Sequence, residues 1–189
     1  MIAGILLAAG CGTRFGAHKL LHPLADGTPM ALAALRNLAP CVDRCVTVVR
    51  PEDTALKALL DAEATGIIAC ANAHLGMGAS LACGVRGTAN ASAWLIALAD
   101  MPFIPQEAIR ALVAQLHAGA AIVAPQYHGQ RGHPVGFGKI HYAALAALRN
   151  DQGARQIIDE HIGGLVLIDC KDPGVVRDID TPQDVPTYL

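Results

Sequence analysis

Hydrophobic residues along the chain fall into two patterns, short continuous runs and longer stretches in which they recur every three or four positions. Continuous runs bounded by Gly, Pro or Asp are typical of strands buried on both faces. They predict strands at residues 2–8, 45–49, 66–70, 94–98, 120–124 and 165–168. The spaced stretches predict amphipathic helices at residues 29–38, 52–62, 78–85, 105–117, 140–149 and 154–161. Segments 131–137 and 175–179 are predicted to be extended.

The order of these elements predicts the fold class. Strands that alternate with helices indicate βα units, a mostly parallel sheet and right-handed crossovers. No repeat, linker or low-complexity stretch interrupts the pattern, so we expect one α/β domain over residues 1–189. Open parallel sheets bind ligands beyond the carboxyl ends of their strands. Two candidate sites lie there, the loop after the first strand and Asp100 after the fourth.

Composition narrows the class of protein. Hydrophobic residues make up 53% of the 189 residues and charged residues 16%, which favours a compact fold over disorder. The formal net charge of −2 gives no indication of nucleic acid or an anionic membrane as a partner. The six cysteines form no C-x-x-C pair. We therefore expect reduced, mostly buried thiols and a cytoplasmic protein.

The stretch "ILLAAGCGTRFGAHK", residues 5–19, has several possible interpretations. A lipoprotein signal needs a basic segment before its apolar run, and no Lys or Arg precedes Arg14. A P-loop needs Gly-Lys-Ser/Thr, which is missing here. A dinucleotide fingerprint has a different glycine spacing, although Arg50 after the second strand would suit the 2′-phosphate of NADP. We expect no export signal, and the NADP interpretation stays open.

The same loop has the chemistry of a phosphate cradle. Gly10, Gly12 and Gly16 leave backbone N–H groups uncovered after a buried strand. Arg14 can bind two phosphate oxygens at once, and Lys19 supplies a mobile positive charge. The loop therefore predicts a site for a nucleoside triphosphate.

The motif Leu7-Ala8-Ala9-Gly10-x-Gly12-Thr13-Arg14-Phe15-Gly16-x-x-Lys19 resembles the signature of the nucleotidyltransferases. It is most similar to that of the molybdenum cofactor cytidylyltransferases and guanylyltransferases, and later motifs extend the resemblance over almost the whole chain. The resemblance implies a Rossmann-like three-layer fold of the nucleotide-diphospho-sugar transferase type. It also implies nucleotide binding by Leu7, Ala8, Ala9, Gly10, Gly12, Thr13, Arg14 and Lys19. Ala9, in place of a second glycine, is similar to the cytidylyl branch.

Candidate metal ligands lie at Asp100 and near residue 180. Magnesium prefers one or two carboxylates together with phosphate oxygens and water. In an extended segment Asp178 and Asp180 point to one face, while Thr181 and Asp184 have the pattern of a helix cap. The resemblance implies that Asp100 and Asp180 hold Mg²⁺, and it leaves open whether Asp178 joins them.

Three further segments are assigned by the resemblance. Gly76 and Ser80, at a predicted helix start, are similar to residues that contact the nucleotide base, although their residue types also suit helix capping. Arg131, His133 and Arg155 resemble residues that face the acceptor substrate. His133 also suits a hydrogen-bonded turn residue.

The resemblance implies transfer of CMP from CTP to molybdopterin with release of pyrophosphate. Lys19, Arg14 and Asp100 are the predicted catalytic residues. Guanylyl transfer and transfer to a sugar or polyol phosphate are close alternatives, and a non-catalytic nucleotide-binding module is an alternative of another class. The implied partners are the nucleotide, a molybdopterin-type acceptor and, transiently, a molybdoenzyme or its chaperone, with no nucleic acid and no membrane.

Overall fold

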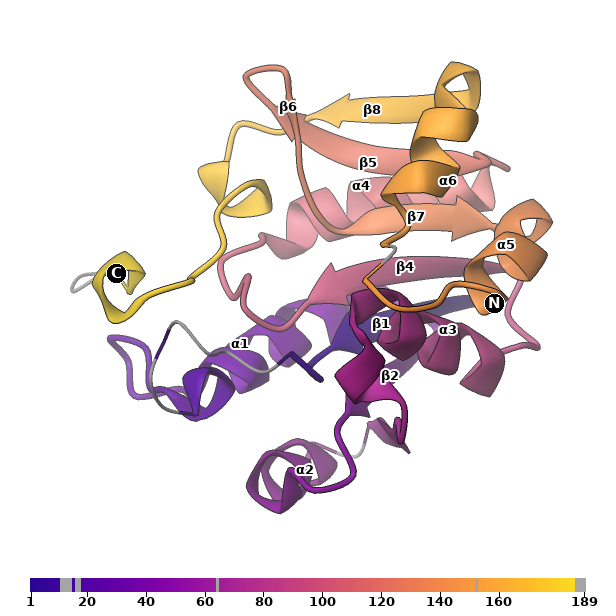
Figure 1. Ribbon diagram of the computed structural model, residues 1–189. Helices are drawn as coiled ribbons and strands as arrows, with labels where there is room; N and C mark the ends of the chain where they lie inside the picture. Colours follow the sequence, from indigo (N-terminus) through magenta and orange to yellow (C-terminus); the bar gives the residue numbers. More distant parts are fainter. Residues whose placement is uncertain (11–14, 16–17, 64, 152, 186–189) are drawn as a thin grey trace.

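The computed structural model describes residues 1–10, 15, 18–63, 65–151 and 153–185 (Figure 1). Its strands are β1 (Ile2–Leu7), β2 (Arg44–Val49), β3 (Gly66–Ala69), β4 (Ala93–Leu98), β5 (Ile122–Tyr127), β6 (Gln130–Arg131), β7 (Val135–Gly138) and β8 (Leu165–Asp169). Its α-helices are α1 (Met30–Leu38), α2 (Thr54–Asp61), α3 (Met77–Gly87), α4 (Gln106–His117), α5 (Tyr142–Ala146) and α6 (Arg155–Glu160).

The strands form a mixed sheet in the order β3-β2-β1-β4-β7-β5-β6, with β8 paired to the other side of β5. Strands β1 to β4 are mutually parallel, whereas β7 runs antiparallel to both β4 and β5. In Figure 1 the arrows of β4 and β8 accordingly point the opposite way from β7. The predicted α/β class with a mostly parallel sheet is confirmed.

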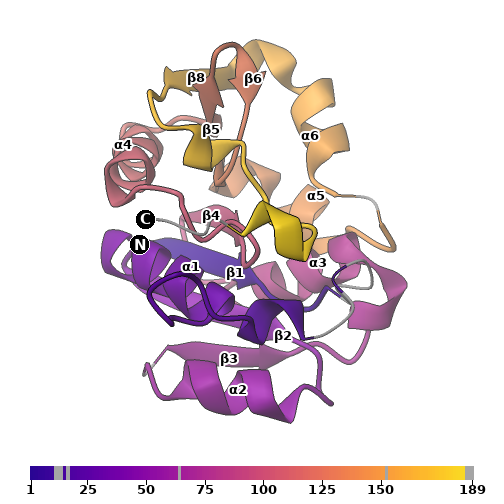
Figure 2. The same ribbon diagram turned by 90° about the vertical axis from the view of Figure 1, so that its left-hand side faces the viewer.

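Helices cover both faces of this sheet, which gives three layers (Figure 2). Successive residues of β1 alternate between two cores, as the period of a strand requires. Leu6 is buried with residues of α1, α2 and α4, and Ile5 is buried with residues of α3, α5 and α6. The continuous apolar run that predicted β1 therefore reflects burial on both faces.

The structure corrects two predicted elements. The helix expected at 140–149 is a 3-10 turn, Lys139–His141, followed by the short α5. The segment expected to be extended at 175–179 joins no strand, and Val175 ends another 3-10 turn. This segment is fastened by the N–H of Ile179, which donates to the carbonyl of Asp100 at 3.0 Å. Ile179 is fully buried, so the C-terminal segment packs beside the loop after β4.

Within the described residues, no helix is both long and apolar enough to cross a membrane.

Candidate active site

A cavity of about 810 Å³ opens beyond the carboxyl ends of the parallel strands. A cavity of this size suits a nucleotide-sized ligand. Its walls come from the loops after β1, β2 and β4, from the start of α3 and from the loop before α6. It is lined by Leu7, Ala9, Gly10, His18, Lys19, Leu20, Leu21, Arg50, Asp53, Leu56, Ala73, His74, Gly76, Met77, Ser80, Leu98, Asp100 and Asp151.

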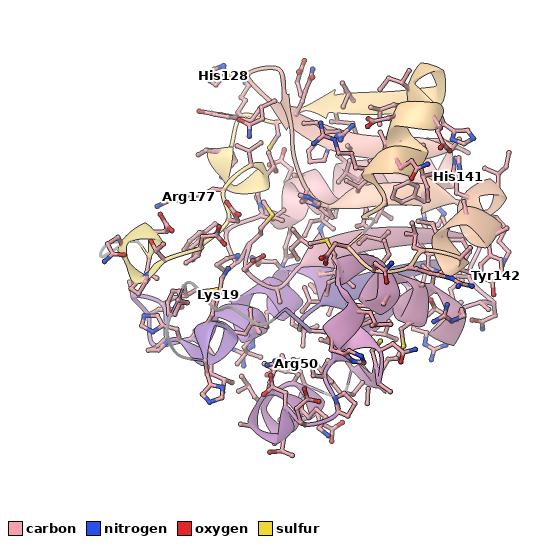
Figure 3. The ribbon with its side chains drawn as sticks, in the orientation of Figure 1. Lys19, Arg50, His128, His141, Tyr142 and Arg177 are labelled. Atoms are coloured by element: carbon pink, nitrogen blue, oxygen red, sulfur yellow. The ribbon has the colours of Figure 1, made fainter. Side chains whose placement is uncertain are left out.

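Lys19, labelled in Figure 3, is one of the charged residues that line this cavity. It begins a 3-10 turn, Lys19–Leu21, and only 8% of its surface is exposed. Its Nζ donates to Oδ2 of Asp100 at 2.9 Å and to Oδ1 of Asp180 at 3.1 Å. The structure thus brings together three predicted residues that are up to 161 positions apart in the chain.

The two carboxylates keep Lys19 protonated. Burial alone would lower the pKa of Lys19, because it penalises the charged form. The hydrogen bonds and negative charges of Asp100 and Asp180 outweigh this effect and raise the pKa above its ordinary value. Lys19 is therefore a fixed positive charge in the cavity wall throughout the neutral range.

Asp180 is positioned by the turn that follows it. The carboxylate of Asp184 accepts hydrogen bonds from the N–H of Asp180, and from both the N–H and the hydroxyl of Thr181. These bonds lower the pKa of Asp184. The pattern Thr-Pro-Gln-Asp forms the cap expected from its sequence, although the element it begins is a three-residue 3-10 turn, Pro182–Asp184.

The donors at this place fit a hard divalent cation. Two carboxylate oxygens converge on the single ammonium of Lys19, so the local geometry already holds one positive charge between Asp100 and Asp180. In the described ranges no group of three His, Cys, Asp or Glu side chains forms a closed metal site. Magnesium is commonly held by one or two carboxylates plus substrate phosphates, so this pair fits it. Asp178 is exposed and does not line the cavity.

The predicted nucleotide-binding residues are partly brought together. Leu7, Ala9 and Gly10 line the cavity, whereas Ala8 is buried in the core on the other face of the sheet. Gly12, Thr13 and Arg14 lie outside the described residues. The alternation of Leu7, Ala8 and Ala9 between the two faces follows the periodicity of a strand, and Gly10 lines the cavity where the strand has ended. Lys19, the last residue of the predicted motif, also lines the cavity.

The start of α3 forms another wall. Gly76 and Ser80 line the cavity as the sequence predicts, and the Ser80 hydroxyl donates to the carbonyl of Gly76 at 3.5 Å. Gly76 has φ +124°, and a Cβ there would collide with the Asp151 carboxylate and the backbone of Asn150. Glycine is required at this position on both grounds.

The three residues predicted to face the acceptor lie outside this cavity. Arg131 is half-buried in β6, and Arg155 is an exposed residue of α6 whose side chain pairs with Asp159 at 3.7 Å. The ring of His133 is buried, and its Nδ1 has no hydrogen-bond partner in the described part of the chain. Burial lowers the pKa of His133, the negative charges of Asp100 and Asp178 oppose this effect, and the charge of Arg131 adds to it. His133 is therefore an electrostatic neighbour of Asp100, and Arg131 is a neighbour of His133, whereas Arg155 is not brought to the site.

Sequence reasoning missed part of the cavity wall. Arg50, considered only for NADP, lines the cavity and pairs with Asp53 at 3.4 Å (Figure 3). Its position directly after β2 was the available signal, since parallel strands end at one edge of the sheet. Met77 lines the cavity and is 50% exposed. Asp151 also lines it, and a loop residue of this kind has no periodicity that would predict its position.

A nucleotide-sized cavity at this edge of a three-layer sheet, with a buried lysine between two aspartates, fits a site for a nucleotide and a divalent cation. Residues 4–165 match the MobA-like NTP transferase domain family, and the chain belongs to that family. The protein is therefore a nucleotidyltransferase.

The relatives of this chain have diverse names. Purine catabolism protein PucB of Bacillus subtilis is 28% identical, over 97% of this chain and 93% of the relative. Nicotine blue oxidoreductase of Paenarthrobacter nicotinovorans is 28% identical, over 97% of this chain and 94% of the relative. Molybdenum cofactor guanylyltransferase of Burkholderia ambifaria is 42% identical over a shorter match, 65% of this chain and 60% of the relative.

Solved structures support the fold. A nucleotidyl transferase from Methanothermobacter has a TM-score of 0.83 at 22% identity, covering 97% of this chain and 94% of the other. Rv0371c of Mycobacterium tuberculosis, described as a complex with manganese, has a TM-score of 0.70 at 23% identity, covering 99% and 94%. At these identities the likeness shows the three-layer nucleotidyltransferase fold.

Proposed function

We propose that the protein transfers CMP from CTP to a molybdopterin-type acceptor and releases pyrophosphate. The observation that carries the proposal is the buried Lys19 held between Asp100 and Asp180 at the wall of a nucleotide-sized cavity. Molybdenum cofactor guanylyltransferase among the relatives supports an acceptor of this class. Ala9, which lines the cavity where the resemblance distinguishes the two branches, supports CTP as donor.

The reaction needs positioning and charge neutralisation more than a covalent nucleophile. An oxygen of the acceptor's phosphate attacks the α-phosphorus of CTP, the bond to the bridging oxygen breaks, and pyrophosphate leaves with the electron pair. Lys19 neutralises negative charge on the triphosphate, and Arg14 is proposed to do the same. Asp100 and Asp180 would hold Mg²⁺, which supplies positive charge to phosphate oxygens when bound.

The acceptor end is proposed to lie on the side of Asp100 that faces β6 and β7. Arg131 and His133 are proposed to come from this side, because the charges of Asp100 and Arg131 both act on His133. A guanidinium can bind the acceptor's phosphate through two parallel hydrogen bonds. Nδ1 of His133 has no hydrogen-bond partner among the described residues, and a hydrogen bond to the acceptor is proposed to satisfy it.

The test is a panel assay. The protein is incubated with Mg²⁺, each of the four nucleoside triphosphates in turn and extracted molybdopterin, and pyrophosphate is measured. We expect release with CTP. Release with GTP alone would overturn the CTP assignment, and release only with sugar or polyol phosphates would overturn the acceptor.

Two control arms separate the other classes of function. Tight binding of CTP without pyrophosphate release for any acceptor would indicate a non-catalytic module. A change in NADPH fluorescence on adding the protein would indicate reductase chemistry. The second arm is included because one relative is named an oxidoreductase and Arg50 lies in the cavity wall.

A further inference from the structure

We infer that Asp151 selects the base of the donor nucleotide, accepting a hydrogen bond from the amino group of cytosine, guanine or adenine and rejecting uracil. The inference rests on the proposed function, because it concerns the same cavity. Asp151 lines that cavity, and it comes from the loop between α5 and α6.

Two backbone contacts fix Asp151 over the start of α3. The N–H of Met77 donates to Oδ1 of Asp151 at 3.3 Å, and the N–H of Gly78 donates to the carbonyl of Asn150 at 2.8 Å. Gly76 leaves the room for this approach, since any side chain there would displace the carboxylate. The loop therefore presents the Asp151 carboxylate at a set place in the cavity wall.

Capping of α3 accounts for only one of the two carboxylate oxygens. The bond from Met77 engages Oδ1, and across the described ranges no hydrogen bond to Oδ2 and no cationic partner of Asp151 are found. A carboxylate bonded to one N–H still has free acceptor capacity. Asp151 can thus cap the helix and bind a ligand at the same time.

The sign of its charge indicates which part of the nucleotide Asp151 faces. Lys19, held by Asp100, provides the positive charge that suits the triphosphate. An unpaired carboxylate beside those phosphates would repel them, and like charges at close range are unfavourable. The uncharged ribose and base are the parts of the nucleotide that a carboxylate can approach without this penalty. Met77, half-exposed in the same wall, offers an apolar thioether surface for a flat ring.

Hydrogen-bond chemistry then gives the selection. Cytosine presents an amino group at N4, guanine at N2 and adenine at N6, and all three are donors, so the selection acts against uracil. Uracil, like thymine, presents a carbonyl at O4, an acceptor that a carboxylate repels. Hydrogen bonds to charged groups contribute enough for a discrimination of about 10- to 100-fold between CTP and UTP.

The experiment measures the Kd of CTP and of UTP by calorimetry with Mg²⁺ present and no acceptor. We expect the wild type to bind CTP about 10- to 100-fold more tightly than UTP. Asp151→Asn keeps an oxygen for the Met77 N–H but can also donate, so the ratio should fall toward one. Asp159→Asn, which removes an exposed carboxylate of α6, is the matched control and should keep the wild-type ratio.

Several outcomes would overturn the inference. These are a wild-type ratio near one, an unchanged ratio in Asp151→Asn, or equal weakening of both nucleotides in that variant, which a purely structural cap would give. If Asp151→Asn does not fold, Asp151→Ser repeats the test with a smaller acceptor. The binding ratio does not depend on turnover. A protein that shows the ratio change but never releases pyrophosphate would contradict the proposed function alone.

Discussion

The half of the sheet formed by β1 to β4 and the half formed by β5 to β8 bring residues to the site in different ways. In the first half all strands are parallel, so their carboxyl ends meet at one edge and line one cavity. In the second half β7 runs antiparallel to β4. Arg131 lies in β6, and His133 lies in the segment that leads into β7. We therefore propose that the parallel half binds the nucleotide and that the mixed half binds the acceptor.

Asp100 lies at the border of the two halves, and its removal should have the largest effect. We expect Asp100→Asn to keep the fold, since Lys19 retains Asp180, and to lower turnover by about 10²-fold or more, the scale for losing a preorganised electrostatic group. Pyrophosphate release measures the effect. Asp61→Asn, at an exposed position at the end of α2 outside the cavity, is the control and should change turnover little. Unchanged release in Asp100→Asn would contradict the mechanism.

A substitution at Gly76 tests the contact between the start of α3 and the loop before α6, because that loop packs on Gly76. Gly76→Ala should lower the free energy of unfolding by about 2–3 kcal/mol, from a strained positive φ and a displaced Asp151 loop. Gly27→Ala is the matched control, with φ +82° and open space around the added Cβ, and should cost only about 1 kcal/mol. Urea unfolding gives both values. Equal losses would show that the contact with Asp151 contributes no stability.

Arg131 tests the assignment of the acceptor to the mixed half. Arg131→Gln should raise the KM for the acceptor about 10-fold, the effect of one charge-assisted hydrogen bond, and leave the KM for CTP unchanged. Arg155→Gln is the comparison, and we expect a smaller change because this side chain is exposed and pairs with Asp159. Steady-state kinetics with each substrate varied separates the two parameters. A rise in the KM for CTP would contradict the proposal that the two halves bind different substrates.

The smallest expected effect concerns His141, which lies far from Lys19 (Figure 3). Burial, and to a lesser extent the charge of His161, lowers the pKa of His141. The unfolded chain therefore takes up this proton at a higher pH than the native state does, and stability falls as the pH drops through the ordinary histidine range near 6.5. His141→Phe should lose less unfolding free energy between pH 7 and pH 5 than the wild type. An identical pH profile would contradict this origin, and pyrophosphate release should be unchanged.

The sequence predicted the parallel half well because its signals are local and periodic. Buried strands appear in the sequence as continuous apolar runs. The loops that follow these strands contain Lys19 and Asp100, which the sequence predicted as site residues. Capping chemistry likewise predicted how Thr181 and Asp184 hold the residue before them. These are short-range effects, which the order of residues determines directly.

The rest of the site depends on long-range packing. The reversal of β7 and the short α5 follow from tertiary contacts that no local periodicity encodes. Asp151 reaches the cavity through its contact with α3, which lies 74 positions away in the chain. Arg155 has a suitable residue type in a suitable motif, yet helix geometry turns it outward to Asp159. A motif thus identifies chemistry, whereas only the fold decides what that chemistry faces.

The bond between Ile179 and Asp100 also has a consequence for biosynthesis. During translation, most of the strands and loops that form the cavity are made before Asp180. Asp180, the second carboxylate bonded to Lys19, follows that lysine by 161 positions. A nascent chain interrupted before residue 180 would contain most of the cavity but only one of the two aspartates. The segment around Asp180 is therefore synthesised after Lys19 and Asp100, and a nascent chain that has not reached it lacks the second carboxylate of the charged centre.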